Sequence, residues 1–264
     1  MMLLIYNLVL LILLPIMVTR IIIKGFKDKD YFFNLSNRFG FYKEQSKRNL
    51  IWFHAVSLGE VIGSEQLLRK FTANNEIILT VSTPTGFRHA RELYGNKIII
   101  VYAPWDFFVF VTFFFKKFNP ICLILFETEI WPSMISIASK RKIPIILSNA
   151  RLSESSLRRY LVLKPFAKNI LNKISLVLAQ SKQHVERFIQ IDVLKDNIKQ
   201  VGSIKFDAIF EKATSSIRIN NDNKYLLAAS THEGEEEIVI DSYCKLLEDF
   251  QNLKIILVPR HPER

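Results

Sequence analysis

The sequence predicts an α/β protein built on a mostly parallel sheet with helices on both faces. From residue 50 onward, apolar runs of about six residues alternate with longer helical patterns, which is typical of βαβ units. The runs are continuous in Ile, Leu and Val, as strands are when both faces of a sheet are covered. We therefore predict strands at Leu50–Ala55, Ile77–Val81, Lys97–Tyr102, Ile121–Phe126, Ile143–Ser148 and Leu176–Ala179, and helices near 61–71, 86–94, 106–117, 133–141, 154–172 and 182–190.

A polar stretch divides this pattern from a shorter second one. Residues 212–224 are rich in Asn, Ser and Thr, as connections between units are. One helix and two strands follow, too few to complete a doubly wound domain. We predict a complete Rossmann-like N-terminal domain over 24–210 and an incomplete second Rossmann-like domain over 211–264. The second contains strands Tyr225–Ala229 and Lys254–Val258 and helix Glu235–Phe250.

The chain begins with an apolar segment that predicts a membrane anchor helix over residues 1–23. Met1 to Thr19 contain no charged side chain, and their length approaches the roughly 20 residues that a membrane-crossing helix needs. Basic residues follow this run instead of preceding it, which argues against a cleaved signal peptide and places the rest of the chain in the cytoplasm. Pro15 shortens the regular helix, so a helix lying in the interface is an alternative. A buried helix of a soluble protein is another.

Charge and cysteine content narrow the class of protein. Residues 1–204 contain 28 Lys and Arg against 14 Asp and Glu, whereas residues 205–264 contain 8 against 11. A basic region attracts nucleic acid, anionic lipid or an acidic metabolite, or is a solvated surface, and no nucleic-acid-binding motif is present. The two cysteines and five histidines are scattered, so we predict a reducing compartment and neither metal nor cofactor.

The loops after the first two predicted strands contain candidate catalytic and binding residues, because ligands of open α/β sheets bind beyond the carboxyl ends of strands. Glu60 opens a helix there and could be a general base, although a Glu near a helix N-terminus is also favoured by the helix dipole. Hydroxyls and backbone N–H groups at these helix starts suit an anion or a sugar, but Ser and Thr are also ordinary caps. The candidate substrate-binding residues are Ser57, Gly59, Thr83, Thr85 and Gly86.

Other acidic and basic side chains follow later strands. Glu127 and Glu129 come directly after a buried strand and could orient a substrate, or they could be solvated loop charges. Lys205 could neutralise a departing phosphate, or pair with Asp207 in a surface salt bridge. In the tail, Arg260 follows a strand and can bind phosphate bidentately.

Six of the nine residues from Phe107 to Phe115 are Phe. This tract could line an acyl-binding or membrane-facing patch, but a buried helix is the favoured interpretation because aromatic residues mostly pack in cores. Neither a Gly-x-Gly-x-x-Gly sequence nor a P-loop occurs in the chain, which argues against dinucleotide and nucleoside triphosphate binding.

Taken together, eight segments resemble the 3-deoxy-D-manno-octulosonic acid (Kdo) transferases of lipopolysaccharide assembly. They occur in order along essentially the whole chain. The segments are 38–42 (Arg-Phe-Gly-Phe-Tyr), 54–60 (His-Ala-Val-Ser-Leu-Gly-Glu), 83–86 (Thr-Pro-Thr-Gly), 127–132 (Glu-Thr-Glu-Ile-Trp-Pro), 148–153 (Ser-Asn-Ala-Arg-Leu-Ser), 202–207, 230–236 and 257–264.

The resemblance implies a GT-B fold and metal-independent, inverting transfer of Kdo. The donor would be CMP-Kdo and the acceptor a lipid A precursor (lipid IVA), at the cytoplasmic face of the inner membrane. It also implies that Glu60 deprotonates the acceptor hydroxyl and that Glu127 and Lys205 stabilise the transition state. Pro259 and Arg260 resemble part of the CMP site.

One departure from the family is large. Members continue past the equivalent of residue 264 through a full nucleotide-binding domain, so we expect the 264-residue chain to be inactive alone. The alternative is a non-catalytic, membrane-bound remnant that binds only the lipid acceptor. A nucleic-acid-binding protein is a third hypothesis without a supporting motif.

Overall fold

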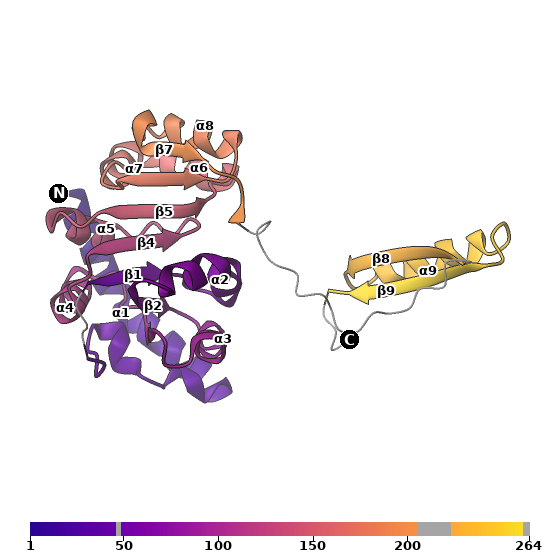
Figure 1. The fold of residues 1–264 in the computed structure, drawn as a ribbon, viewed down its shortest axis with the longest axis horizontal. Helices are drawn as coiled ribbons and strands as arrows, with labels where there is room; N and C mark the ends of the chain where they lie inside the picture. Colours follow the sequence, from indigo (N-terminus) through magenta and orange to yellow (C-terminus); the bar gives the residue numbers. More distant parts are fainter. Residues whose placement is uncertain (46–48, 205–222, 261–264) are drawn as a thin grey trace. The chain divides into compact units, whose positions relative to one another are not determined.

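The computed structural model describes residues 1–45, 49–204 and 223–260 (Figure 1). Lys205, Asp207 and the end of the tail loop at 261–264 lie outside the described residues. The chain divides into two compact units, residues 1–209 and 210–264, and each is described by itself.

Seven parallel strands form one sheet in the first unit, in the order β3-β2-β1-β4-β5-β6-β7 (Figure 1). This confirms the predicted parallel α/β class. The six strands that were predicted with bounds are present, and a short edge strand just before Gly202, whose bounds the sequence did not define, completes the sheet. The strands are β1 (Leu50–His54), β2 (Glu76–Val81), β3 (Ile99–Tyr102), β4 (Cys122–Phe126), β5 (Ile145–Ala150), β6 (Leu176–Ala179) and β7 (Ile198–Gln200).

Helices cover both faces of the sheet and enclose two apolar cores. Trp52 and Phe53 are successive residues of β1, so their side chains point to opposite faces. Trp52 packs with the core under α4 to α8, and Phe53 packs with the core under α2 and α3. The helices are α2 (Leu58–Thr72), α3 (Pro84–Tyr94), α4 (Phe108–Phe118), α5 (Pro132–Lys140), α6 (Glu154–Val162), α7 (Lys164–Leu171) and α8 (Lys182–Gln190).

The helix predicted over 154–172 is two helices, α6 and α7, and this part of the prediction was wrong. Leu163 separates them with φ −114° and ψ 38°, outside the helical region. Pro165 in the first turn of α7 has no N–H to continue the hydrogen-bond pattern of α6.

The Phe-rich tract is divided between core and surface. Phe114 and Phe115 in the second half of α4 are fully buried, and Phe114 stacks on Trp52 with ring centroids 3.9 Å apart. Phe108 at the start of α4 is 37% exposed. The favoured core interpretation therefore holds for the second half of the tract, while the first half lies at the surface.

Helix starts in this unit are capped in two different ways. Four helices use the hydroxyl of their own preceding residue, which accepts a hydrogen bond from the first turn. Helices α4 and α5 follow Phe107 and Trp131, which have no capping side chain. Their caps come from elsewhere: Asn7 Oδ1 accepts from Phe108 N at 2.7 Å, and Asp106 accepts from the first turn of α5. The self-capped helices are α2, α3, α6 and α8, with Ser57, Thr83, Ser153 and Ser181.

The first helix, α1 (Met2–Lys27), extends beyond the predicted end at residue 23 and is fastened to the domain. Tyr6 donates a hydrogen bond to Asp106 Oδ2 at 2.9 Å near its start, and Ile21 and Gly25 are buried near its end. Most of its other side chains are exposed. Within the part of the chain that the structure describes, α1 is the one helix long and apolar enough to cross a membrane, with a mean hydropathy of 2.5 over 18 residues.

Two short 3₁₀ helices, Lys29–Tyr31 and Leu35–Phe39, join α1 to the sheet. Gly40 ends the second one with φ 84°, and a Cβ there would lie 2.4 Å from the backbone oxygen of Phe110 in α4. Only glycine combines this left-handed conformation with so close an approach.

The second unit contains one parallel strand pair, β8 (Lys224–Thr231) and β9 (Leu253–Pro259). Helix α9 (Glu235–Leu246) connects them (Figure 1). All three elements were predicted, with α9 ending before the predicted Phe250. Three successive Glu residues in its first turn suit the positive end of the helix dipole.

Candidate active site

The candidate site lies where the strand order of the sheet reverses. Strands β1 and β4 are neighbours, but the chain proceeds from β1 towards β3 on one side and from β4 towards β7 on the other. The loops that leave their carboxyl ends therefore diverge, and this switch point is the usual ligand position in open α/β sheets. Glu60 follows β1, and Glu127 and Glu129 follow β4.

Glu60 is held in place by the loop that precedes it. Its Oε2 accepts from Val56 N at 2.8 Å, and its Oε1 accepts from the Ser57 hydroxyl at 2.9 Å. Ser57 Oγ in turn accepts from Glu60 N at 3.3 Å, so the pair forms a reciprocal cap on α2. The residue is 9% exposed. Both carboxylate oxygens are thus oriented at the start of a helix before any ligand binds.

Burial and neighbouring acids raise the pKa of Glu60 to about 7. Burial is the largest cause, the negative charge of Glu129 the next, and Glu127 adds a smaller effect. The hydrogen bonds from Val56 and Ser57 oppose the rise because they stabilise the carboxylate. A carboxyl group that titrates near neutral pH is suited to accept a proton from a hydroxyl.

The loop after β4 brings in the other two acids. Glu127 has φ 60°, a left-handed conformation that is costly for a residue with a Cβ, and its N–H bonds Ser148 O at 2.9 Å. Glu129 Oε2 accepts from the indole N–H of Trp131 at 2.7 Å. Burial and Glu127 raise the pKa of Glu129 as well, although the Trp131 hydrogen bond opposes this. Three carboxyl groups therefore influence one another at the switch point.

The predicted hydroxyl and glycine residues also gather in this region. Thr83 Oγ1 caps α3 by accepting from Gly86 N at 3.2 Å, and the Thr85 hydroxyl lies 3.4 Å from it. A Cβ at Gly86 would lie 3.2 Å from Leu58 N and from the backbone carbon of Ser57. Gly86 thus lets the start of α3 approach the loop that holds Glu60, whereas Gly59 has no such neighbour within 3.4 Å.

Beneath the acids lies a buried polar cluster. The Trp52 indole donates to Thr80 Oγ1 at 2.8 Å, and His54 Nδ1 lies 2.7 Å from the same oxygen. Burial lowers the pKa of His54 to about 3, so its imidazole is neutral. The ring packs edge-on against Trp131, 4.6 Å between centroids. His54 therefore supports the acidic loop and does not act as a proton carrier at neutral pH.

Two further residues at this edge were not given a role from sequence. Arg38 is 4% exposed, donates to Ser82 O at 3.1 Å and lies over the Tyr102 ring at 4.6 Å. Asn149, at the end of β5, has φ 53° and a buried Nδ2 with no partner. Both residues belong to segments that resemble the family. The positive φ of Asn149 could not be predicted from the sequence alone.

The remaining candidates lie in the second unit or outside the described residues. Pro259 ends β9 and Arg260 follows it, where Arg260 N donates to Thr231 O at 3.1 Å and the side chain is exposed. Lys205 is not among the described residues. In residues 1–45, 49–204 and 223–260, no group of three His, Cys, Asp or Glu residues is arranged to hold a metal ion.

Solved structures show the same fold at low sequence identity. The UDP-GlcNAc 2-epimerase of Neisseria meningitidis, solved with UDP-GlcNAc, superposes with a TM-score of 0.57 at 15% identity, over 81% of this chain and 66% of that one. The epimerase of Methanocaldococcus jannaschii gives 0.55 at 15% identity, with the same coverage. The chain therefore has a GT-B-like fold, as the sequence predicted.

The sequence comparison names the family within that class. Residues 34–208 match the family described as 3-Deoxy-D-manno-octulosonic-acid transferase (kdotransferase). The chain belongs to this family of glycosyltransferases. A 3-deoxy-D-manno-octulosonic acid transferase of Haemophilus influenzae is 34% identical over 98% of this chain. A bifunctional glycosyltransferase/methyltransferase of Fusobacterium nucleatum is 33% identical over 84% of it. The chain spans 63% and 36% of these relatives' lengths.

Proposed function

We propose that the protein transfers Kdo from CMP-Kdo to a hydroxyl of a lipid A precursor, with Glu60 as the general base. The observation that supports this most directly is the pKa of Glu60, about 7, in a carboxyl group whose two oxygens are oriented at the switch point. Removing the acceptor proton as the new bond forms needs such a base. Family membership supplies the reaction class.

The other predicted residues take complementary roles in this proposal. Glu127 and Lys205 stabilise the transition state, and Pro259 and Arg260 bind the CMP group. An inverting displacement needs a base on one side of the anomeric carbon and neutralisation of the leaving phosphate on the other, without a metal ion. The proposed substrate contacts of the first unit are Ser57, Gly59, Thr83, Thr85 and Gly86.

The proposed location is the cytoplasmic face of the inner membrane. The apolar and largely exposed α1 supports contact with lipid, and the basic residues after it support a cytoplasmic orientation. The excess of Lys and Arg in residues 1–204 suits both an anionic membrane surface and a phosphorylated acceptor.

Transfer of radiolabelled Kdo to lipid IVA in detergent micelles tests the role of Glu60. Because the 264-residue chain is expected to be inactive alone, the assay uses it joined to the remaining part of the Haemophilus influenzae relative. Replacing a general base lowers kcat by about 10²- to 10⁴-fold, so we expect Glu60→Gln to show this loss with little change in the KM for acceptor. Glu65→Gln, on the same helix, is the matched control and keeps activity. Transfer by Glu60→Gln at the wild-type rate would remove Glu60 from the chemistry.

Separate titrations of CMP and of lipid IVA examine residues 1–264 alone. The expectation that this chain is inactive by itself stays a prediction, as does the alternative of a remnant that binds only acceptor. The remnant hypothesis predicts acceptor binding without CMP binding. Measurable CMP affinity, lost in Arg260→Ala, rejects it.

A further inference from the structure

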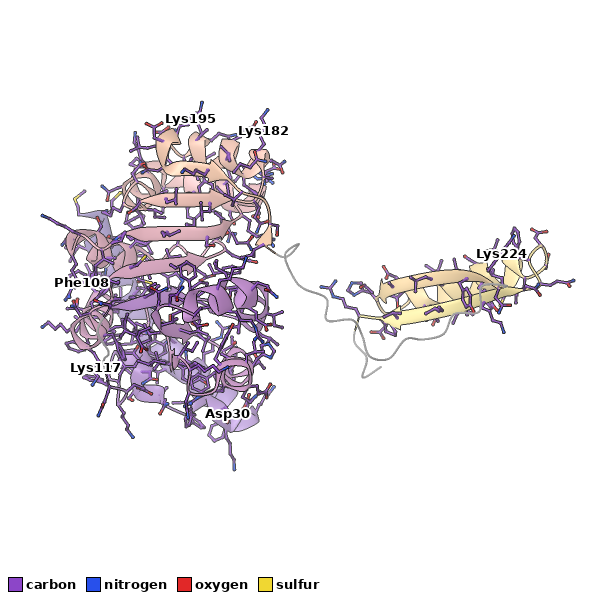
Figure 2. The ribbon with its side chains drawn as sticks, viewed as in Figure 1. Asp30, Phe108, Lys117, Lys182, Lys195 and Lys224 are labelled. Atoms are coloured by element: carbon purple, nitrogen blue, oxygen red, sulfur yellow. The ribbon has the colours of Figure 1, made fainter. Side chains whose placement is uncertain are left out.

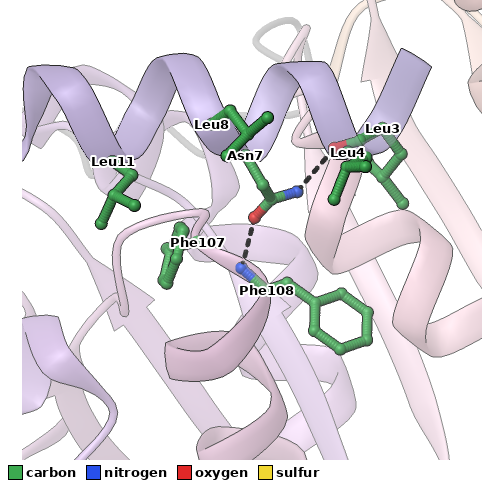
Figure 3. A pocket seen from close by; sticks show the side chains of 7 residues that line it. All are labelled: Leu3, Leu4, Asn7, Leu8, Leu11, Phe107 and Phe108. Carbon is green, nitrogen blue, oxygen red and sulfur yellow. Dashed lines mark hydrogen bonds between the residues drawn. The ribbon is translucent and has the colours of Figure 1, made fainter. Parts of the chain in front are cut away.

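An apolar cavity of about 400 Å³ lies between α1 and the start of α4. Figure 3 shows its walls, with leucines of α1 facing the two aromatic side chains across the space. The volume is within the range of small-molecule sites in proteins. The lining residues are Leu3, Leu4, Asn7, Leu8 and Leu11 of α1, with Phe107 and Phe108.

Asn7 is the one polar side chain among these lining residues, and its hydrogen bonds are made within the protein. Its Nδ2 donates to Leu3 O at 2.9 Å and to Ser133 Oγ at 3.2 Å, and its Oδ1 accepts from Phe108 N (Figure 3). The cavity therefore offers no side-chain group for water or a polar ligand, and it favours hydrocarbon.

Two ammonium groups lie beside this cavity. Lys140 Nζ is 5.6 Å from the centroid of the Phe108 ring, which forms one wall. Lys173 lines a neighbouring hollow that shares Leu3 with the cavity. Burial and the charge of Lys140 lower the pKa of Lys173. Lys173 Nζ donates to the backbone oxygen and to Oδ1 of Asn169. Neither lysine has an acidic partner within 4.0 Å among the described residues, so an anion would relieve their repulsion.

The cavity is continuous with the exposed outer surface of α1. Leu4, which lines it, is 65% exposed, and Ile12 and Ile16 further along the helix are 74% and 64% exposed. The helix is long and apolar enough for a bilayer, so hydrocarbon is a medium that suits this surface. An apolar cavity open to a bilayer, with paired cations beside it, matches one molecule: a lipid with a hydrocarbon chain and an anionic headgroup.

We propose that the cavity between α1 and α4 binds one acyl chain of an anionic phospholipid of the bilayer, and that Lys140 and Lys173 hold its phosphate. The lipid is a resident of the site and not a substrate, so the proposal stands independently of the reaction. Figure 2 labels Phe108 and Lys117 towards opposite ends of α4, and the site uses the Phe108 end.

Native mass spectrometry of residues 1–264 in detergent, titrated with phosphatidylglycerol and with phosphatidylcholine of the same acyl chains, tests this. We expect one tightly bound phosphatidylglycerol per chain. Each lysine near a lipid headgroup contributes about a fivefold preference for anionic lipid, so Lys140→Gln with Lys173→Gln brings the affinity for phosphatidylglycerol down about 25-fold. The control is Lys116→Gln with Lys117→Gln, at the other end of α4, which keeps the affinity.

Variants of α1 test the acyl chain separately from the charge. Leu8→Trp fills the cavity and removes the bound lipid, whereas Ile12→Trp on the exposed side of the same helix keeps it. Circular dichroism tests whether each variant is folded. If Leu8→Trp is not folded, the result of the lysine variants decides the proposal. The proposal is overturned if both lipids bind equally and the lysines have no effect, or if Leu8→Trp retains lipid as Ile12→Trp does. Binding of lipid IVA without phosphatidylglycerol, or a dimer that excludes lipid, also overturns it.

Discussion

Glu60 and Asp106 are two buried carboxyl groups with the same raised pKa, about 7, and different surroundings. Asp106 accepts from Ser133 N, Met134 N and the Tyr6 hydroxyl, at 2.8 to 2.9 Å. Burial alone raises its pKa, and all three hydrogen bonds oppose the rise. Glu60 has neighbouring carboxylates as a second cause of its raised pKa.

The difference separates a structural acid, Asp106, from Glu60, the acid that we propose as a general base. The partners of Asp106 are fixed parts of α1 and α5, so its environment changes only if those helices move. The environment of Glu60 depends on the charges of Glu129 and Glu127, which a bound cation or phosphate alters. A similar pKa therefore does not indicate a similar role, and the source of the shift is the informative quantity.

The largest expected effect is on the structural side of this comparison. Asp106→Ala leaves two backbone N–H groups of α5 and the Tyr6 hydroxyl without their acceptor. We expect the free energy of unfolding to fall by about 3 kcal/mol, the sum of a lost helix cap and unpaired buried donors. Urea denaturation at pH 7 measures it, with exposed Asp196→Ala as the control. A loss below that of the control would mean that Asp106 does not fasten α5.

The next effect is of opposite sign, at Glu60. Its folded pKa of about 7 exceeds the ordinary glutamate pKa of 4.5, so the folded state binds the proton more tightly and stability falls as pH rises through this window. Glu60→Gln removes the buried charge, and we expect about 2 kcal/mol of added stability at pH 8 and none at pH 4. Denaturation at pH 4, 6 and 8 tests this, with Glu65→Gln as control. Equal stabilisation at all three values would contradict it.

A third prediction concerns the coupling itself. Glu129→Gln keeps an acceptor for the Trp131 indole but removes the negative charge next to Glu60. We expect the pKa of Glu60 to fall by about one unit, while that of Asp106 stays unchanged. Carboxyl ¹³C NMR titration follows both groups in one sample. Parallel shifts of the two acids would show that the variant disturbs the fold and would remove the proposed distinction.

The smallest effect belongs to Tyr6→Phe. The change deletes one of three donors to Asp106 and keeps the ring, so we expect a loss of about 1 kcal/mol. Thermal or urea unfolding of the variant, compared with Tyr31→Phe, measures it. No change in the midpoint would indicate that the hydrogen bond from Tyr6 to Asp106 does not help to hold α1 on the domain.

The sequence predicted the sheet because continuous Ile, Leu and Val runs are distinctive. It did not define the bounds of β7, because Ile198-Lys199-Gln200 is short, polar and at an edge. It also joined α6 and α7, because apolar spacing continues across Leu163 and only the Pro at 165 signals the break.

The site was predictable only in part. The position of Glu60 after a strand followed from the pattern, because parallel strands end at one edge of the sheet. The effect of Glu129 on the pKa of Glu60 did not follow from the pattern, because it depends on β1 and β4 being neighbours in the sheet. The sequence also did not predict that Asp106 is a hydrogen-bond acceptor for α1 and α5. Its partners lie 27 and 100 residues away in the chain.

The helices α4 and α5 are capped by side chains that are not their own preceding residues, and the cap of α4 comes from α1. This bears on the order in which the chain folds. Asn7 is separated from Phe108 by 101 residues and from Ser133 by 126. During synthesis α1 emerges first, but its polar partners exist only once α5 has been made, and contacts of such long separation form slowly. Until then the apolar surface of α1 has no packing partner in the domain. We expect docking of α1 to be the last step of folding.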